Sequence, residues 1–131
     1  MSTLKVATIQ DLGAGQKATL KAGTPCVMNP VSSGGKATQA HGLSGTPSFV
    51  EMYLECLTSE QGYSVGDRIQ MNWIDSNTVT SGVAAVLDAT NVTLLASTGT
   101  ILVAINKTTP GGIVALTAAN WKLLAVPYLL N

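Results

Sequence analysis

Hydrophobic and polar residues alternate along several short stretches of this chain. The clearest stretch is FVEMYLEC at residues 49–56, in which aliphatic residues and a cysteine alternate with Glu and Tyr. Because successive side chains of a β-strand point to opposite faces, this pattern predicts a strand with one face turned to a core. A helix formed by the same residues would gather only a narrow apolar stripe, so the strand is favoured.

Further strands are predicted at residues 68–73, 83–87, 92–96, 101–105 and 123–130, with Gly-, Asn-, Ser- and Thr-rich loops between them. Short strands at intervals of roughly ten residues are typical of an antiparallel sandwich or barrel. We therefore predict an all-β protein, an antiparallel, jelly-roll-like β-sandwich. Its predicted core consists of Val50, Met52, Leu54, Ile69, Met71, Trp73, Val83, Val92, Leu94, Val103 and Trp121.

The first third of the chain has a different amino-acid composition. Residues 1–48 are rich in Gly, Ser, Thr, Lys and Ala, and Leu4 and Val6 begin a short alternating stretch that ends at a DLG turn. The segment GQKATLKAGTP is echoed by GGKATQAHGLSGTP. We expect an N-terminal extended arm and a strand-turn region in residues 1–48, followed by the sandwich core in residues 49–131. Together they would form a single compact domain.

The C-terminal segment LTAANWKLLAVPYLLN is almost uncharged, since only Lys122 carries a charge after Trp121. Thr117 is predicted to cap a helical turn, and residues 123–130 to form a last strand with one face toward the core and the other toward a neighbouring subunit. Pro127 cannot donate a ladder hydrogen bond, so its part of the strand should lie at an edge or bulge. The predicted subunit interface consists of Leu4, Val6, Leu124, Val126, Tyr128 and Leu130.

Composition favours assembly and argues against several partners. Only 11% of residues are charged and 46% are hydrophobic, which indicates a surface that is coated by Ser, Thr and Asn or covered by other subunits. With one arginine, Arg68, and no basic run, nucleic acid is not expected as a partner. Residues 123–130, the longest apolar run, fall short of the roughly 20 residues that span a bilayer. The first ten residues lack the features of a secretory signal, so synthesis in a cytoplasm is expected.

The sequence contains no motif that requires catalysis. His41, the single histidine, lies between Gly and Ser residues without a nucleophile motif and is predicted to be a solvated loop residue. Cys26 and Cys56 are predicted to be two buried thiols, and their spacing with His41 does not fit a zinc site. The GAGQKAT segment at residues 13–19 lacks the spacing of a phosphate-binding loop. We expect no enzymatic activity, no metal and no cofactor.

Five segments carry a resemblance to a known family. They are Cys56 at the end of its strand, GYSVGD at residues 62–67, DATNV at residues 88–92, NKT at residues 106–108 and LTAANWKL at residues 116–123. In order and spacing they resemble the β-sandwich module at the distal ends of bacteriophage tail-fibre proteins. The resemblance implies a non-enzymatic virion protein that forms a homotrimer and contacts other virion proteins.

The chain departs from that family in one respect, because the module here makes up most of the sequence and no fibre shaft accompanies it. We expect either a short tail-fibre or tail-tip component or a capsid decoration protein. In a sandwich, recognition falls to loops, so a tail protein would meet a host-surface carbohydrate or protein there. The predicted receptor-facing residues are Asn77, Thr78, Thr80, Thr98, Lys107 and Thr108.

Overall fold

The structure, a computed structural model, describes residues 18–70, 82–99 and 102–130, and it confirms the all-β prediction. Within these residues the only helical element is a 3-10 turn, η1 (Ala118–Asn120). Thr117 is its N-cap as predicted, but the threonine side chain makes no capping hydrogen bond. The strands are β1 (Leu20–Ala22), β2 (Cys26–Met28), β3 (Lys36–Ala40), β4 (Phe49–Cys56), β5 (Arg68–Gln70), β6 (Val83–Leu87), β7 (Asn91–Ala96), β8 (Val103–Ile105), β9 (Ile113–Ala115) and β10 (Trp121–Leu130).

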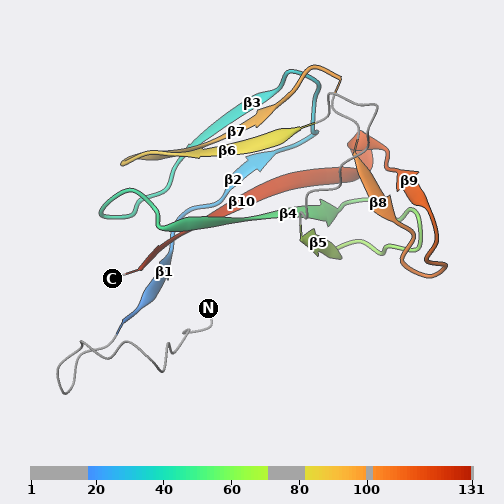
Figure 1. Cartoon of the computed structure of the whole chain (residues 1–131), viewed down its shortest axis with the longest axis horizontal. Helices are drawn as coiled ribbons and strands as arrows, with labels where there is room; N and C mark the ends of the chain where they lie inside the picture. The colour runs from blue at the N-terminus through green and yellow to red at the C-terminus, as the bar shows by residue number, and fades with distance from the viewer. Residues whose placement is uncertain (1–17, 71–81, 100–101, 131) are drawn as a thin grey trace.

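The strands form two antiparallel sheets and a hairpin (Figure 1). A five-stranded sheet has the order β1-β10-β4-β5, with β2 also paired to β10, and a three-stranded sheet has the order β3-β7-β6. The two sheets share one core, because β3 packs against β2, and β7 packs against β2 and β10. Strands β8 and β9 pair at one end of this sandwich.

The sheets do not follow the predicted boundary between residues 1–48 and 49–131, where the composition of the sequence changes. Strands β1 and β2 belong to the same sheet as β10, and β3 belongs to the other sheet. Cys26, Met28 and Val31 are buried in the common core. The N-terminal strand-turn region therefore completes both sheets, whereas the predicted arm lies outside the described residues.

Strand β10 is the central strand of its sheet, which explains how the apolar C-terminal segment is accommodated. It pairs with β4 along eight positions, and its other edge pairs first with β2 and then with β1. Trp121, Leu123 and Ala125 have no exposed surface. One face of this strand is thus buried within the chain, as the sequence predicted.

Pro127 is buried in this central strand and not at a sheet edge, but it lies where the pairing register shifts by one residue between β1 and β2, which is the bulge that the sequence predicted as the alternative. The amide of Gly23 donates to the carbonyl oxygen of Pro127 at 2.8 Å. In a strand, the nitrogen and the carbonyl oxygen of one residue point to the same side, so the nitrogen of Pro127 faces the break between β1 and β2. No ladder partner is lost there, and an interior proline is tolerated.

Most of the predicted core residues that the structure describes face the core. Leu54, Val92, Leu94 and Trp121 are buried, while Met71 and Trp73 lie outside the described residues. The other members that pack against the core are partly buried, namely Val50, Met52, Ile69 and Val83.

Val103 is a correction to the predicted core, because its neighbours Leu102 and Ala104 are buried instead. Ala104 lies opposite Val114 in the hairpin, and Val103 faces the other way with Ile105. The run ILVAI at residues 101–105 is apolar at every position, so alternation could not decide which set faces inward.

The two cysteines confirm the prediction of buried thiols. Both are free, and burial raises the pKa of each thiol above its ordinary value. The Cys26 thiol donates to the carbonyl oxygen of Ala37 at 3.4 Å, and the Cys56 thiol to that of Thr58 at 3.2 Å. They act as small core residues, since a raised pKa disfavours the reactive thiolate.

Candidate assembly and recognition sites

The five-stranded sheet presents an apolar surface on the side away from the core. Alternate residues of β10 point to this side, and the strand register places Phe49 and Ala22 beside Tyr128, Val27 beside Leu124 and Leu20 beside Leu130. The rings of Phe49 and Tyr128 stack with centroids 5.1 Å apart. We name this surface the outer apolar face; it consists of Leu20, Ala22, Val27, Phe49, Leu124, Val126, Tyr128 and Leu130.

The predicted interface residues of β10 all lie on this face, with different exposure. Leu130 is 46% exposed, Val126 and Tyr128 are half-buried, and Leu124 is only 6% exposed between its strand neighbours Val27 and Tyr53. Leu4 and Val6 lie outside the described residues.

The sequence did not single out Val27 and Phe49, which are 43% and 39% exposed on the same face. These residues belong to strands that are far from β10 in the chain. Only the strand register brings them beside its outer side chains.

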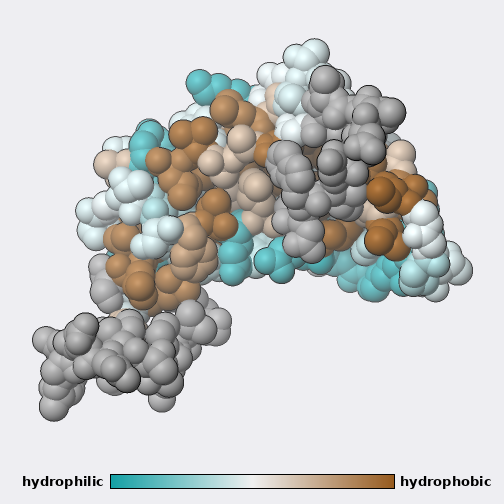
Figure 2. Space-filling model, viewed as in Figure 1, coloured by the Kyte–Doolittle hydropathy of each residue, from teal (hydrophilic) through white to brown (hydrophobic). Residues whose placement is uncertain are grey.

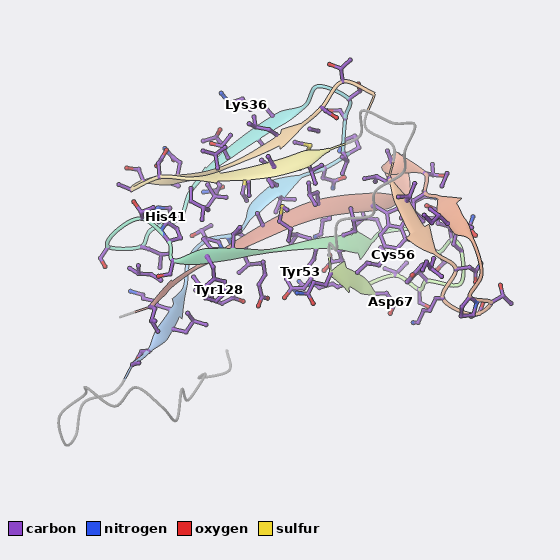
Figure 3. All side chains as sticks on the ribbon, in the orientation of Figure 1. Lys36, His41, Tyr53, Cys56, Asp67 and Tyr128 are labelled. Carbon is purple, nitrogen blue, oxygen red and sulfur yellow. The ribbon has the colours of Figure 1, made fainter. Side chains whose placement is uncertain are left out.

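Charged residues occupy the other end of the same sheet surface. Glu55 accepts hydrogen bonds from Arg68 and Lys122, each at 2.9 Å, and the Lys122 bond followed by the Arg68 bond lowers the pKa of this carboxyl. Tyr53 donates to Glu51, and this bond raises the pKa of Tyr53 to about 12. Figure 3 shows Tyr53 and Tyr128 on the side of the sheet that faces away from the second sheet. The surface therefore changes from apolar to charged along its length, and Glu51 lies beside Val126 within the apolar part.

A network of side chains joins the loop after β4 to β8 and β10. The Glu60 carboxylate accepts from the Trp121 indole at 2.6 Å and from the Thr117 amide at 2.7 Å. The Tyr63 hydroxyl donates to the carbonyl oxygen of Ile105 at 2.7 Å, and its ring packs edge-on against Trp121 with centroids 5.3 Å apart. Two segments that carry the family resemblance, GYSVGD and LTAANWKL, thus meet at this end of the sandwich.

Predicted receptor-facing residues Lys107 and Thr108 extend from this network. Lys107 pairs with Asp67 at 2.6 Å, and this bond, followed by one from the Ser64 amide, lowers the pKa of Asp67. Asn106 Oδ1 accepts from the amides of Thr108 and Thr109, which fixes the turn. Lys107 and Thr108 are both exposed.

Gly62 allows the two loops to approach each other. Its φ is +82°, and a Cβ at this position would lie 2.8 Å from the Thr108 hydroxyl. Both the backbone conformation and the close contact favour glycine.

Thr98 lies in a different turn, after β7, where it is exposed. The amide of the next residue, Gly99, donates to the Ser33 hydroxyl at 2.7 Å, which ties this turn to the β2–β3 connection. Asn77, Thr78 and Thr80 lie outside the described residues. The structure therefore groups Lys107 with Thr108 and places Thr98 on another loop.

His41 is a further correction, since it is 1% exposed and not solvated. The Leu43 amide donates to Nδ1 at 3.0 Å, so Nδ1 carries no proton and the ring is the neutral Nε2–H tautomer. Nε2 then donates to the carbonyl oxygen of Asp88 at 3.0 Å. Because both ring nitrogens are engaged, His41 serves to join the β3–β4 connection to the β6–β7 turn. Flanking glycine and serine gave no signal of this burial.

Asp88 shapes the turn that His41 contacts. Its Oδ1 accepts from the amides of Thr90 at 2.8 Å and Asn91 at 2.6 Å, and the Asn91 bond followed by the Thr90 bond lowers the pKa of Asp88. The DATNV segment is thus a side-chain-stabilised hairpin turn. It lies with His41, separate from the network of Glu60 and Trp121.

Among the described residues, no group of three or more His, Cys, Asp or Glu side chains could hold a metal ion. No helix in the same part of the chain is long and apolar enough to cross a membrane. Comparisons with protein-family models, with curated proteins and with solved structures found no match for this chain.

Proposed function

We propose that this chain is a bacteriophage virion structural protein, a short tail-fibre or tail-tip component that takes part in host attachment. The observation that carries the proposal is that four of the five segments behind the family resemblance lie together, all except DATNV. Cys56 exchanges backbone hydrogen bonds with Gly66 and Asp67 and lies opposite Trp121, while Tyr63 contacts both Trp121 and Ile105.

Self-assembly is the second part of the proposal. A chain with so few charges that also exposes Val27, Phe49 and Leu130 on one sheet surface gains stability when a second copy covers them. The trimeric number follows from the resemblance. A jelly-roll-like sandwich with an N-terminal arm is the corresponding architecture.

Receptor binding would use loops, because the strands are engaged in the core and in assembly. Exposed Lys107 and Thr108 offer an ammonium and a hydroxyl to a host-surface carbohydrate or protein. Asn77, Thr78, Thr80 and Thr98 complete the proposed set. A capsid decoration protein is the second candidate, and the low charge of the chain favours it.

Immunogold electron microscopy of particles of the phage that encodes the chain tests both candidates. Label at the tail tip supports the first function, and label over the head supports decoration. Purified particles without label would contradict both.

A second experiment addresses the loops. If the chain is a tail protein, simultaneous replacement of Asn77, Thr78 and Thr80 by alanine is expected to reduce its adsorption to host cells and to leave its thermal stability unchanged. Thr38→Ala, at an exposed threonine of β3, is the matched control and should leave adsorption unchanged. For a decoration protein, adsorption would be unchanged in both, and loss of residues 4–9 would release the protein from capsids.

A further inference from the structure

Strand β6 forms an open edge of the three-stranded sheet. Within the described residues it pairs only with β7, and its sequence VAAVL contains no charge and no proline. Val86 is 48% exposed. Proteins usually protect such edges with charges, prolines or bulges, because an open edge is a template for another strand.

The hydrogen-bond pattern shows which backbone groups are available at this edge. The Asp88 amide donates to the carbonyl oxygen of Asn91, and the Ser97 amide donates to that of Gly82. Bonded pairs alternate along an antiparallel ladder, so Ala84 and Val86 also bond to β7. The amides and carbonyls of Val83, Ala85 and Leu87 therefore point away from β7.

The core beneath this edge is only partly covered. Strands β2 and β3 lie together on one side of the sandwich, so β6 lies on the side of β4 and β5. Figure 1 draws β4 and β6 nearer to the viewer than β2 and β3, and Figure 2 shows apolar residues over this region. Core-facing residues on this side are half-buried, whereas their counterparts on β2 and β7 are buried. The half-buried set is Val50, Met52, Ile69, Val83, Ala85 and Leu87.

We propose that residues 4–9 of a neighbouring copy add to the free edge of β6 as a further strand. The sequence LKVATI fits this place, because Leu4 and Val6 alternate with Lys5 and Ala7. When Leu4 and Val6 face the half-buried core residues, Thr8 faces them as well, and Lys5, Ala7 and Ile9 face the other side. The proposal rests on the self-assembly proposed above.

The length of the connecting chain limits how far the arm can reach. Residues 10–17 link the arm to the described residues and can span at most roughly 26–29 Å. Strand β1 lies on the β2 side of the five-stranded sheet, opposite β6. A copy's own arm would therefore have to pass around the sandwich to reach β6.

Amide hydrogen exchange, followed by NMR on the full-length assembled protein, tests the added strand. The amides of Val83, Ala85 and Leu87 should exchange roughly a hundredfold more slowly than in the Leu4→Asp/Val6→Asp variant. Amides of Ala84 and Val86 bond to β7 and should stay protected in both proteins, which shows that β6 itself remains folded. Lys5→Asp is the matched control and should keep the protection.

Two results would overturn the added strand: rapid exchange of the three amides in the unmodified protein, or protection that survives the double variant. The second result would show that a segment other than residues 4–9 pairs with the edge of β6.

A mixed sample tests whether the arm comes from a neighbour. Unlabelled copies carry a spin label at Lys5→Cys, since Cys26 and Cys56 are buried, and are reassembled with ¹⁵N-labelled unmodified copies. Broadening of the Val83, Ala85 and Leu87 signals is expected. Broadening that occurs only when the spin label and ¹⁵N are in one chain would contradict the exchange. Neither experiment involves the outer apolar face or virions, so this inference can fail while the proposed function stands.

Discussion

Glu60 is the residue that fixes the start of β10 against the loop that follows β4. Its carboxylate accepts from the fully buried Trp121 and from the Thr117 amide. Burial acts to raise the pKa of Glu60, but the bond from Trp121 and then those from Thr117 outweigh it, so the pKa lies below 4.5. The ionised form is therefore the one that stabilises the fold.

Glu60→Ala should lower the free energy of unfolding by about 1.5–3 kcal/mol, the usual value for hydrogen bonds to a charged group. Glu60→Gln keeps an oxygen acceptor and should lose less. Denaturant titration measures both. Equal stability of the alanine variant and the unmodified protein would contradict the role given to Glu60.

The same bonds predict a pH dependence. A carboxyl whose pKa is lowered by folding contributes its full stability above the unfolded value of 4.5 and loses it as the pH falls through the folded value. The stability advantage of the unmodified protein over Glu60→Gln should therefore be full above pH 4.5 and shrink as the pH falls below it. An advantage that stays constant as the pH falls would show that the charge of Glu60 is not involved.

His41 gives a second prediction at the residue scale. His41→Leu leaves the Leu43 amide and the Asp88 carbonyl without their partner, and each buried unsatisfied group costs about 1–3 kcal/mol. Chemical denaturation should show this loss. Gln39→Ala, at an exposed residue of β3, should change stability by less than about 0.5 kcal/mol. A similar loss in both variants would contradict the buried role of His41.

At the scale of elements, alternation predicted the strands whose two faces differ. FVEMYLEC gave β4 in this way. VAAVL at residues 83–87 is apolar at every position, and its strand β6 was predicted from the flanking turns. Alternation failed for Val103, since its strand is apolar at every position. It also could not show that β10 is central, because that depends on β1 and β2, which lie far away in the chain.

The candidate sites were predictable to the extent that they are local. The outer side chains of β10 followed from its own sequence, but Val27 and Phe49 joined them only through strand pairing. The burial of His41 depends on the Asp88 turn, which no local pattern connects to it. Long-range register is the information that alternation lacks.

The central place of β10 determines the effect of a C-terminal truncation. Removal of residues 122–131 would take away the partner of β1, β2 and β4 and uncover Leu54. We expect this chain to lack the circular dichroism of the β-rich fold at all concentrations. A truncated protein that stays folded and only loses its oligomeric state would contradict this topology.

At the scale of the whole molecule, the outer apolar face can be tested without unfolding the chain. Val27→Asp and Leu130→Asp place charges at residues that are 43% and 46% exposed, so folding should be retained while the assembled mass falls. Leu95→Asp, at 37% exposure on the outer side of the other sheet, is the matched control and should assemble normally. If only the Leu95→Asp control lost assembled mass, the copies would be assembled through the three-stranded sheet, and the role given to the outer apolar face would be wrong.

Light scattering of the unmodified protein at micromolar concentration tests the central claim, that other copies cover the outer apolar face. The expected mass is a multiple of the 13.5 kDa chain, and the family resemblance predicts a factor of three. A monodisperse species of 13.5 kDa would contradict the claim, because Val27, Phe49 and Leu130 would then be exposed to water in the native protein.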